Sequence, residues 1–144
     1  HFDSDGFELN REVLVDRGIL KRFFINQYFS RKLNRPVTTS SSTNVLMLEG
    51  NRDSEAMLRS MTAGIHVTGF LGGNFNSTTG DFSLGVTGEL VRNGQRIHPV
   101  NEMNITGNVK TLFENLDEVG NDPYSYSSYR LPTLLFKDVS FSGI

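Results

Sequence analysis

A long run of strand-forming residues, interrupted by glycines, is the feature that most restricts the folds open to this chain. Between residues 64 and 97 β-branched and aromatic residues recur, and the glycines among them are typical of bulges, bends or close contacts between backbones. The pair Asn93-Gly94 separates two strand-like segments, 89–92 and 95–97, and both residues tolerate the positive φ of a type I′ turn. This region therefore predicts a β-hairpin within an antiparallel sheet.

Three segments carry the signals of short helices. Asn26 is a suitable N-cap for a helix that ends before Pro36, and Asp53 is a suitable N-cap for a helix over 56–61. The apolar residues at 109, 112, 113 and 116 share one helical face, which predicts a third helix ending near Gly120.

Further strands are predicted between and after these helices. Residues 12–25 indicate a short hairpin around Gly18, residues 44–49 a buried strand, and residues 133–141 the last strand. The Ser/Thr tract 38–43 is too polar to pack and predicts an exposed loop. We therefore expect an α+β fold with predominantly antiparallel β structure, a mixed or barrel-like β domain with about three short helices, over residues 1–144.

Composition and charge restrict the classes of function. The chain has 144 residues, no cysteine and a formal net charge of −2, so it has no thiolate for catalysis or metal binding and no strong field to attract nucleic acid or an anionic membrane. No apolar run reaches the roughly 20 residues that cross a bilayer. We expect a cytoplasmic protein that binds neither nucleic acid nor membrane.

The residue types that carry catalysis are sparse and badly spaced. The histidines, His1, His66 and His98, lie far apart in the sequence, whereas a zinc peptidase site usually has two of them one helical turn apart. The Gly-x-Ser-x-Gly elbow of serine hydrolases is absent, although a triad of Ser83, His66 and Asp81 stays open because triads form between distant residues. We predict no catalytic and no metal-binding residue here; a hydrolase using Ser83 or His66 is the alternative.

Basic and aromatic residues alternate near the N-terminus. Six basic residues between 17 and 35 are interleaved with Phe23, Phe24, Tyr28 and Phe29, a pattern that is also found in proteins that bind single-stranded nucleic acid. We favour the simpler interpretation, a solvated helix face whose aromatic residues belong to the core.

Two long stretches carry a resemblance to a known family. The first comprises 2–6, Arg11, 18–20, Tyr28 and 30–33; the second comprises 78–83, Gly85, 88–94, 99–100, Glu102, 107–108, Lys110, Phe113, Asn115 and 119–122, followed by 130–133 and 142–143. In order and spacing these residues resemble the C-terminal part of the TldD/PmbA family, also called modulators of DNA gyrase, over essentially the whole chain. The chain begins with His1 instead of methionine, so we expect a fragment that lacks the N-terminal half.

The resemblance implies a cytosolic two-subunit zinc metallopeptidase that acts on unfolded peptides. In this family the TldD-type subunit carries a His-Glu-x-x-x-His helix and a distant cysteine, and neither is present here. The segment 120–132 is similar to the PmbA or TldE type, which lacks the metal ligands. We therefore expect a non-catalytic subunit without a cofactor of its own, with zinc on a TldD-like partner, in a heterodimer or in a homodimer. A homo-oligomeric interaction or structural module without a peptidase role is the alternative.

Small residues mark the candidate contact site. They let another backbone approach closely, and an edge strand next to them could bind an unfolded peptide by adding it to the sheet. The predicted peptide or interface contacts are Gly72, Gly73, Thr78, Thr79, Gly80, Asp81, Phe82 and Ser83. The alternative is that these residues only form bulges and turns.

Overall fold

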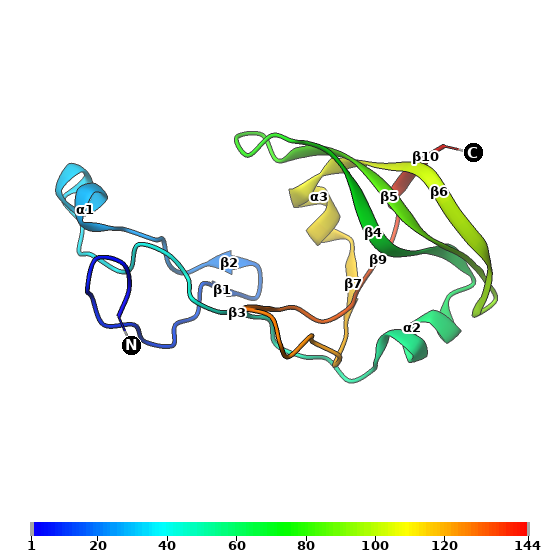
Figure 1. Cartoon of the computed structure of the whole chain (residues 1–144), viewed down its shortest axis with the longest axis horizontal. Coiled ribbons are helices and arrows are strands. Elements are labelled where there is room, and N and C mark those ends of the chain that lie inside the picture. The colour runs from blue at the N-terminus through cyan, green and yellow to red at the C-terminus, as the bar shows by residue number, and fades with distance from the viewer. Residues whose placement is uncertain (1, 144) are drawn as a thin grey trace. The chain divides into compact units, whose positions relative to one another are not determined.

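The computed structural model describes residues 2–143. The chain divides into two compact units, His1–Val45 and Leu46–Ile144, and each is described by itself. The elements are labelled in Figure 1. The short strand β3 (Val45–Leu46) spans the boundary between them along the chain.

The first unit contains two very short strands and one helix. β1 (Val15–Asp16) and β2 (Ile19–Leu20) form the predicted hairpin, with Arg17 and Gly18 at positive φ in its turn. Helix α1 (Gln27–Leu33) begins at the predicted N-cap, where the side chain of Asn26 accepts a hydrogen bond from the backbone N–H of Phe29. The local signals in this part of the sequence are confirmed.

Polar contacts hold the first unit together. The hydroxyl of Thr38 accepts a hydrogen bond from the N–H of Ile25 and donates one to the carbonyl of Phe23. A carboxylate oxygen of Asp3 accepts from the N–H of Ser40 at 3.1 Å. The prediction of an exposed loop over 38–43 is therefore wrong for residues 38–40 and 42, which are half-buried. Residues 38–40 link distant parts of the unit.

The aromatic residues of this unit are not in a core. None of residues 2–45 is buried, and Phe23 and Tyr28 are 67% and 63% exposed. The prediction that these aromatic residues belong to the core is wrong. A segment of about 45 residues is short for enclosing a core of its own.

An antiparallel sheet of four strands dominates the second unit. The strands lie in the order β10-β6-β5-β4; they are β4 (Ala63–Phe75), β5 (Asp81–Arg92), β6 (Gln95–Asn108) and β10 (Ser140–Ser142). The predicted turn joins β5 to β6, with φ of 47° at Asn93 and 74° at Gly94. The same turn donates its two N–H groups to the carbonyls of Thr62 and Met61, so it also fixes the end of helix α2 (Ser54–Ser60).

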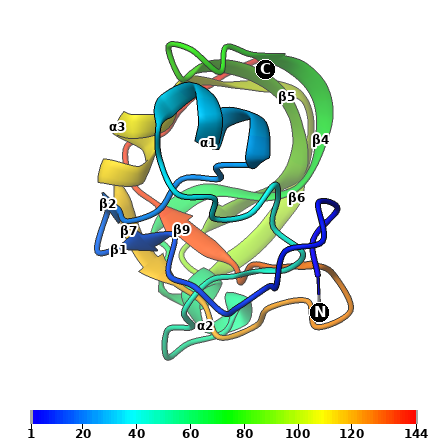
Figure 2. The same ribbon diagram turned by 90° about the vertical axis from the view of Figure 1, so that its left-hand side faces the viewer.

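The sheet is strongly curved but open, as Figure 2 shows. Within residues 2–143 β4 and β10 form its two edges and do not pair with each other. The α+β class with predominantly antiparallel strands is confirmed. The barrel-like form is wrong, because bulges bend β4 and β6 without closing the sheet.

One face of this sheet carries a compact apolar core. Its centre is Phe82, Val86 and Ile105, three buried residues from β5 and β6. Helix α3 (Val109–Glu114) packs Val109 and Leu112 against it. Phe82 and Val86 share a face because side chains in a strand alternate with a period of two.

The remaining elements differ in part from prediction. The third helix ends at Glu114, and Leu116 starts a strand, β7 (Leu116–Val119), that pairs with β9 (Leu134–Phe136). The single strand predicted over 133–141 is split into β9 and β10, with Asp138 at a φ of 52° between them.

The strand predicted over 44–49 is short and is not buried. Only β3 is formed there, and Leu48 is 87% exposed. Within the second unit, the N–H of Met47 donates to the carbonyl of Arg130 in β8 (Tyr129–Arg130). The apolar run therefore reflects a surface ribbon and not a core strand.

Candidate functional site

The strand β4 forms one edge of the four-stranded sheet. β4 pairs with β5 along one side, and no other strand formed by residues 2–143 pairs with its other side. Its 13 residues include no Asp, Glu, Lys, Arg or Pro. Exposed edge strands usually carry charges or proline to prevent unwanted pairing, so an uncharged edge of this length indicates a strand that is paired in use.

Large apolar side chains stand exposed along this edge strand. Phe70, Leu71 and Phe75 are 65%, 62% and 59% exposed. Leu71 is an extra residue at a bulge, because Phe70 is opposite Val86 and Gly72 is opposite Gly85. Side chains of this kind provide pockets and contacts for the alternate side chains of an added strand.

The predicted glycine pair lies inside β4 and has different roles at its two positions. Both glycines have positive φ, 112° at Gly72 and 140° at Gly73. A Cβ on Gly73 would be 2.8 Å from the Cα of Leu84, so the close approach of β5 requires glycine there. A Cβ on Gly72 would meet nothing within 4 Å, so only its backbone conformation favours glycine.

The predicted loop 78–81 is the tip of the β4–β5 hairpin, and its own contacts hold it in place. The side chain of Asn76 accepts hydrogen bonds from the N–H groups of Thr78 and Thr79. Asp81 accepts from Asn108 Nδ2 at 2.8 Å and from Thr79 Oγ1 at 2.7 Å, and these bonds, that from Asn108 foremost, lower the pKa of Asp81. The tip is therefore a fixed turn with an ionised carboxylate.

The two remaining predicted contact residues, Phe82 and Ser83, lie in different environments. Phe82 is buried in the core, where a peptide cannot reach it. Ser83 is exposed and lies opposite Asn74, next to the pairing of Gly73 with Leu84. The structure therefore brings Gly73 and Ser83 together.

The alternative triad of Ser83, His66 and Asp81 does not form. His66 lies opposite Glu89 in the sheet. Ser83 is six residues away from Glu89 along β5, which at roughly 3.3 Å per residue is a separation of about 20 Å. The histidine cannot activate this serine.

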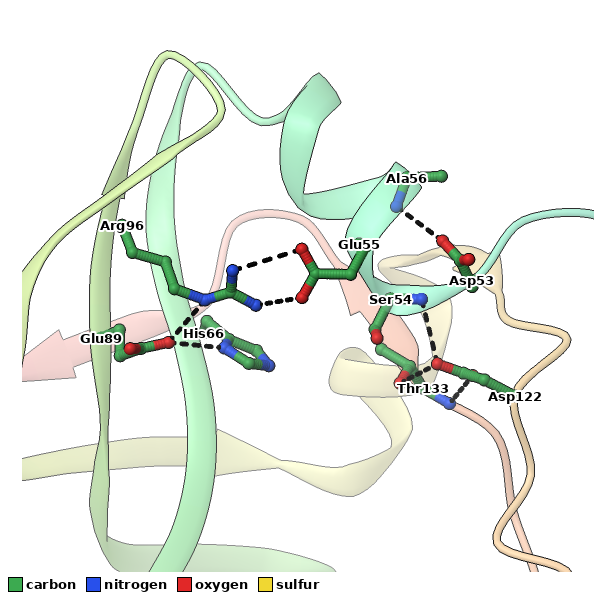
Figure 3. Close-up of polar contacts among 9 residues, drawn as sticks. All are labelled: Asp53, Ser54, Glu55, Ala56, His66, Glu89, Arg96, Asp122 and Thr133. Carbon is green, nitrogen blue, oxygen red and sulfur yellow. Dashed lines mark hydrogen bonds and ion pairs between the residues drawn. The ribbon is translucent and has the colours of Figure 1, made fainter.

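His66 belongs instead to a network of hydrogen bonds and ion pairs, shown in Figure 3. Its Nδ1 is 3.1 Å from Glu89 Oε2, which also accepts from Arg96 Nε at 2.8 Å. Arg96 makes a second, two-fold contact with Glu55 of α2. The hydrogen bond with His66 chiefly lowers the pKa of Glu89, and the one with Arg96 that of Glu55. Every charge in the network has a partner, so it joins α2 to β4, β5 and β6.

A second polar contact, also in Figure 3, fixes the beginning of α2. Asp122 accepts hydrogen bonds of 2.9 Å from the N–H of Ser54, the N–H of Thr133 and the hydroxyl of Thr133. Burial raises the pKa of Asp122, but the hydrogen bonds from Thr133 and Ser54 outweigh it and leave the pKa below 3.8. Nothing local in the sequence shows this role of Asp122, because its partners Thr133 and Ser54 lie 11 and 68 positions away.

The described residues do not provide the ligand set that a zinc peptidase needs. Within residues 2–143 no group of three or more His, Cys, Asp or Glu side chains is arranged to hold a metal ion. The carboxylates near His66 are occupied by Arg96 instead. These residues therefore do not fit a zinc ion. In the same range no helix has the length and apolarity to span a membrane.

Comparisons with known proteins agree with this architecture. Residues 1–143 match the family model described as the PmbA/TldA metallopeptidase C-terminal domain. The chain is 34% identical to the metalloprotease PmbA homolog of Buchnera aphidicola subsp. Baizongia pistaciae, over 99% of this chain and 33% of that protein. It is 32% identical to the metalloprotease PmbA of Escherichia coli O157:H7, over 99% of this chain and 32% of that protein.

A crystal structure shows the same fold. It is that of a Bacteroides thetaiotaomicron protein that carries the name modulator of DNA gyrase; the TM-score is 0.95, the identity is 43%, and 99% of this chain and 33% of that chain are covered. The chain spans about a third of the length of the relatives that it matches. By its family match over nearly all its residues, the chain belongs to the PmbA/TldD metallopeptidase family, as its C-terminal domain.

Proposed function

We propose that this chain is the C-terminal domain of a PmbA- or TldE-like subunit that is itself non-catalytic and acts in a cytoplasmic two-subunit zinc metallopeptidase. A TldD-like partner subunit carries the zinc, and the complex cleaves unfolded peptides. The relatives at 34% and 32% identity both bear the PmbA name, which supports the subunit type. The described residues offer no metal-binding cluster, which supports zinc on the partner.

We propose that this domain contributes to the complex through the free edge of β4. An extended peptide can add to such an edge through main-chain hydrogen bonds, which give affinity with little dependence on sequence. The exposed side chains of Phe70, Leu71 and Phe75 add apolar contact. In this proposal the edge either holds unfolded substrate or pairs with a strand of the partner subunit.

The first experiment assigns the catalytic role. Full-length protein and its cognate TldD-like subunit are purified separately and mixed, and zinc content and cleavage of an unfolded polypeptide are measured for each and for the mixture. We expect cleavage only in the mixture and zinc only on the partner. Stoichiometric zinc or cleavage with this protein alone would contradict the proposal.

The second experiment tests the strand edge with matched variants. Leu71→Lys places a charge at an exposed bulge of the edge strand β4, where Leu71 is 62% exposed. Ile97→Lys is the control, because Ile97 is an extra residue at a bulge of β6, which β5 separates from β4, and is 51% exposed. We expect only Leu71→Lys to weaken peptide binding or subunit pairing, by at least tenfold, at unchanged stability.

A third measurement distinguishes the proposed two-subunit complex from the homo-oligomeric alternative. Light scattering of the full-length protein with and without the TldD-like subunit shows which complex forms. If the protein associates only with itself and never supports cleavage, the module without a peptidase role replaces our proposal. If Leu71→Lys and Ile97→Lys changed peptide binding and subunit pairing equally, the edge of β4 would be excluded as the contact site.

A further inference from the structure

The turn between β5 and β6 carries a side chain that can react with its own backbone. Asn93 is exposed and is followed by Gly94. The backbone nitrogen after an asparagine can attack the side-chain amide, and glycine permits this best because it has no side chain to obstruct the approach. Asn93-Gly94 is the only Asn-Gly pair in the sequence, so the chemistry of this kind concentrates at one turn.

The reaction replaces ammonia with water. The nitrogen of Gly94 loses its proton and bonds to Cγ of Asn93, while the bond from Cγ to Nδ2 breaks and ammonia leaves. The product is a cyclic imide. Water then opens the imide at one of its two carbonyl carbons and gives aspartate or isoaspartate, so water is the co-reactant and ammonia the leaving group.

The folded turn holds the reacting nitrogen in another contact. The N–H of Gly94 donates to the carbonyl of Met61 and the N–H of Asn93 to that of Thr62, both at 2.8 Å. A Cβ on Gly94 would lie 2.5 Å from the carbonyl oxygen of Arg59, so the turn packs directly against the end of α2. Ring closure needs the Gly94 nitrogen free and the backbone of Asn93 rotated, and both conflict with the docked type I′ turn.

Several contacts hold α2 on the sheet. Asp53 caps its first turn, and Glu55 pairs with Arg96 of β6, as Figure 3 shows. Met57 and Leu58 of α2 are buried. Helices shorter than about 12 residues are hardly stable alone in water, so this helix of seven residues depends on its docking. Loss of one docking contact therefore raises the population in which the helix end is released from the turn.

We propose that Asn93 is a deamidation site whose reaction is controlled by the docking of α2. While α2 is docked, Met61 keeps the Gly94 nitrogen from attacking; when α2 opens, the imide forms. Isoaspartate adds one atom to the main chain, and the longer turn cannot keep both bonds to Met61 and Thr62. The reaction thus turns a transient opening of α2 into a permanent weakening of its docking. The inference concerns α2 and its turn, so it does not rest on the proposed function.

Peptide mapping by mass spectrometry tests the site and its protection. Full-length protein and a synthetic peptide of residues 89–97 are incubated in the same mildly alkaline buffer, and conversion of Asn93 is followed over time. We expect the peptide to convert at least tenfold faster, because nothing holds its Gly94 nitrogen. Asn93→Gly, which keeps a residue suited to positive φ, provides the blank. Equal rates in peptide and protein would overturn the protection, and a peptide that does not convert would overturn the site.

Variants that loosen α2 test the control by docking. Glu55→Gln breaks the pair with Arg96, and Asp53→Ala removes the cap. We expect each to speed the conversion of Asn93 in the full-length protein by about two- to fivefold. Deuterium exchange of the Gly94 amide should accelerate by the same factor, because one opening exposes the nitrogen to both reactions.

An ion pair remote from α2 supplies the matched control. Asp117 of β7 pairs with Lys137, so Asp117→Asn removes a comparable charge without touching the helix. We expect this variant to convert at the rate of the unmodified protein. An equal acceleration in Asp117→Asn, or no acceleration in either α2 variant, would overturn the proposal.

Discussion

Two glycines of β5 allow a direct test of how closely β4 and β5 approach. Gly88 is buried opposite Val67, and a Cβ there would overlap the carbonyl oxygen of His66 and lie 3.0 Å from the Cα of Val67. Gly85 is three residues away in the same strand. A Cβ there would be 3.4 Å from the Cβ of Leu71, its nearest neighbour, which is ordinary contact. Neither glycine has a positive φ.

The expected effects of alanine therefore have opposite signs. At a position with room for the methyl group, replacing glycine with alanine raises the free energy of unfolding by about 0.4–1 kcal/mol, because the unfolded chain loses conformational freedom. At Gly88 the backbone of β4 must move away, and overpacking of this kind typically costs about 1–3 kcal/mol. Val67 also packs against the core, so the displacement reaches it. We expect Gly88→Ala to lower the free energy of unfolding by about 1–3 kcal/mol and Gly85→Ala to raise it slightly.

Urea unfolding of the full-length protein, followed by circular dichroism, measures this difference. The slope with denaturant should be the same for both variants, so that the midpoints can be compared directly. Gly85→Ala serves as the control for the general effect of adding a methyl group to β5. If Gly85→Ala destabilises as much as Gly88→Ala, the close approach of β4 at His66 is not what requires glycine.

Three further outcomes are expected from the same unfolding assay. Asp53→Ala removes the side chain that accepts from the N–H of Ala56 and should cost about 1 kcal/mol. Phe82→Ala leaves a cavity at the centre of the core and should lower the free energy of unfolding by about 3–5 kcal/mol. Asp122→Asn should destabilise at neutral pH. Since folding lowers the pKa of Asp122, its contribution is present above pH 3.8 and is lost as pH falls through the lowered value, so wild type and variant should converge in acid.

Local chemistry made several features predictable from the sequence. The N-caps at Asn26 and Asp53 and the turn at Asn93-Gly94 depend on side chains and φ preferences within a few residues, and all three are confirmed. The motif order identified the family, which the match over residues 1–143 confirms. The absence of cysteine excluded thiol chemistry directly.

Tertiary structure decided the features that depend on distant residues. The apolar residue Leu116 continues the helical spacing, but strand pairing with Phe136 places it in β7. The glycine pair 72–73 indicated a bulge, a bend or a close backbone contact, but only pairing with β5 shows that the bulge lies at Leu71 and the close contact at Gly73.

The candidate site shows the same division. Glycines and small residues marked the hairpin 72–83, but whether β4 lies at the edge of the sheet is a property of the strand order, which no single strand encodes. Asp122 and the Arg96 network gain their roles from partners up to 68 positions away. The sequence by itself therefore determined the caps, the turn and the family. Only the tertiary structure decided which edge stays open and which apolar side chains stay exposed, because burial depends on what the rest of the chain brings next to them.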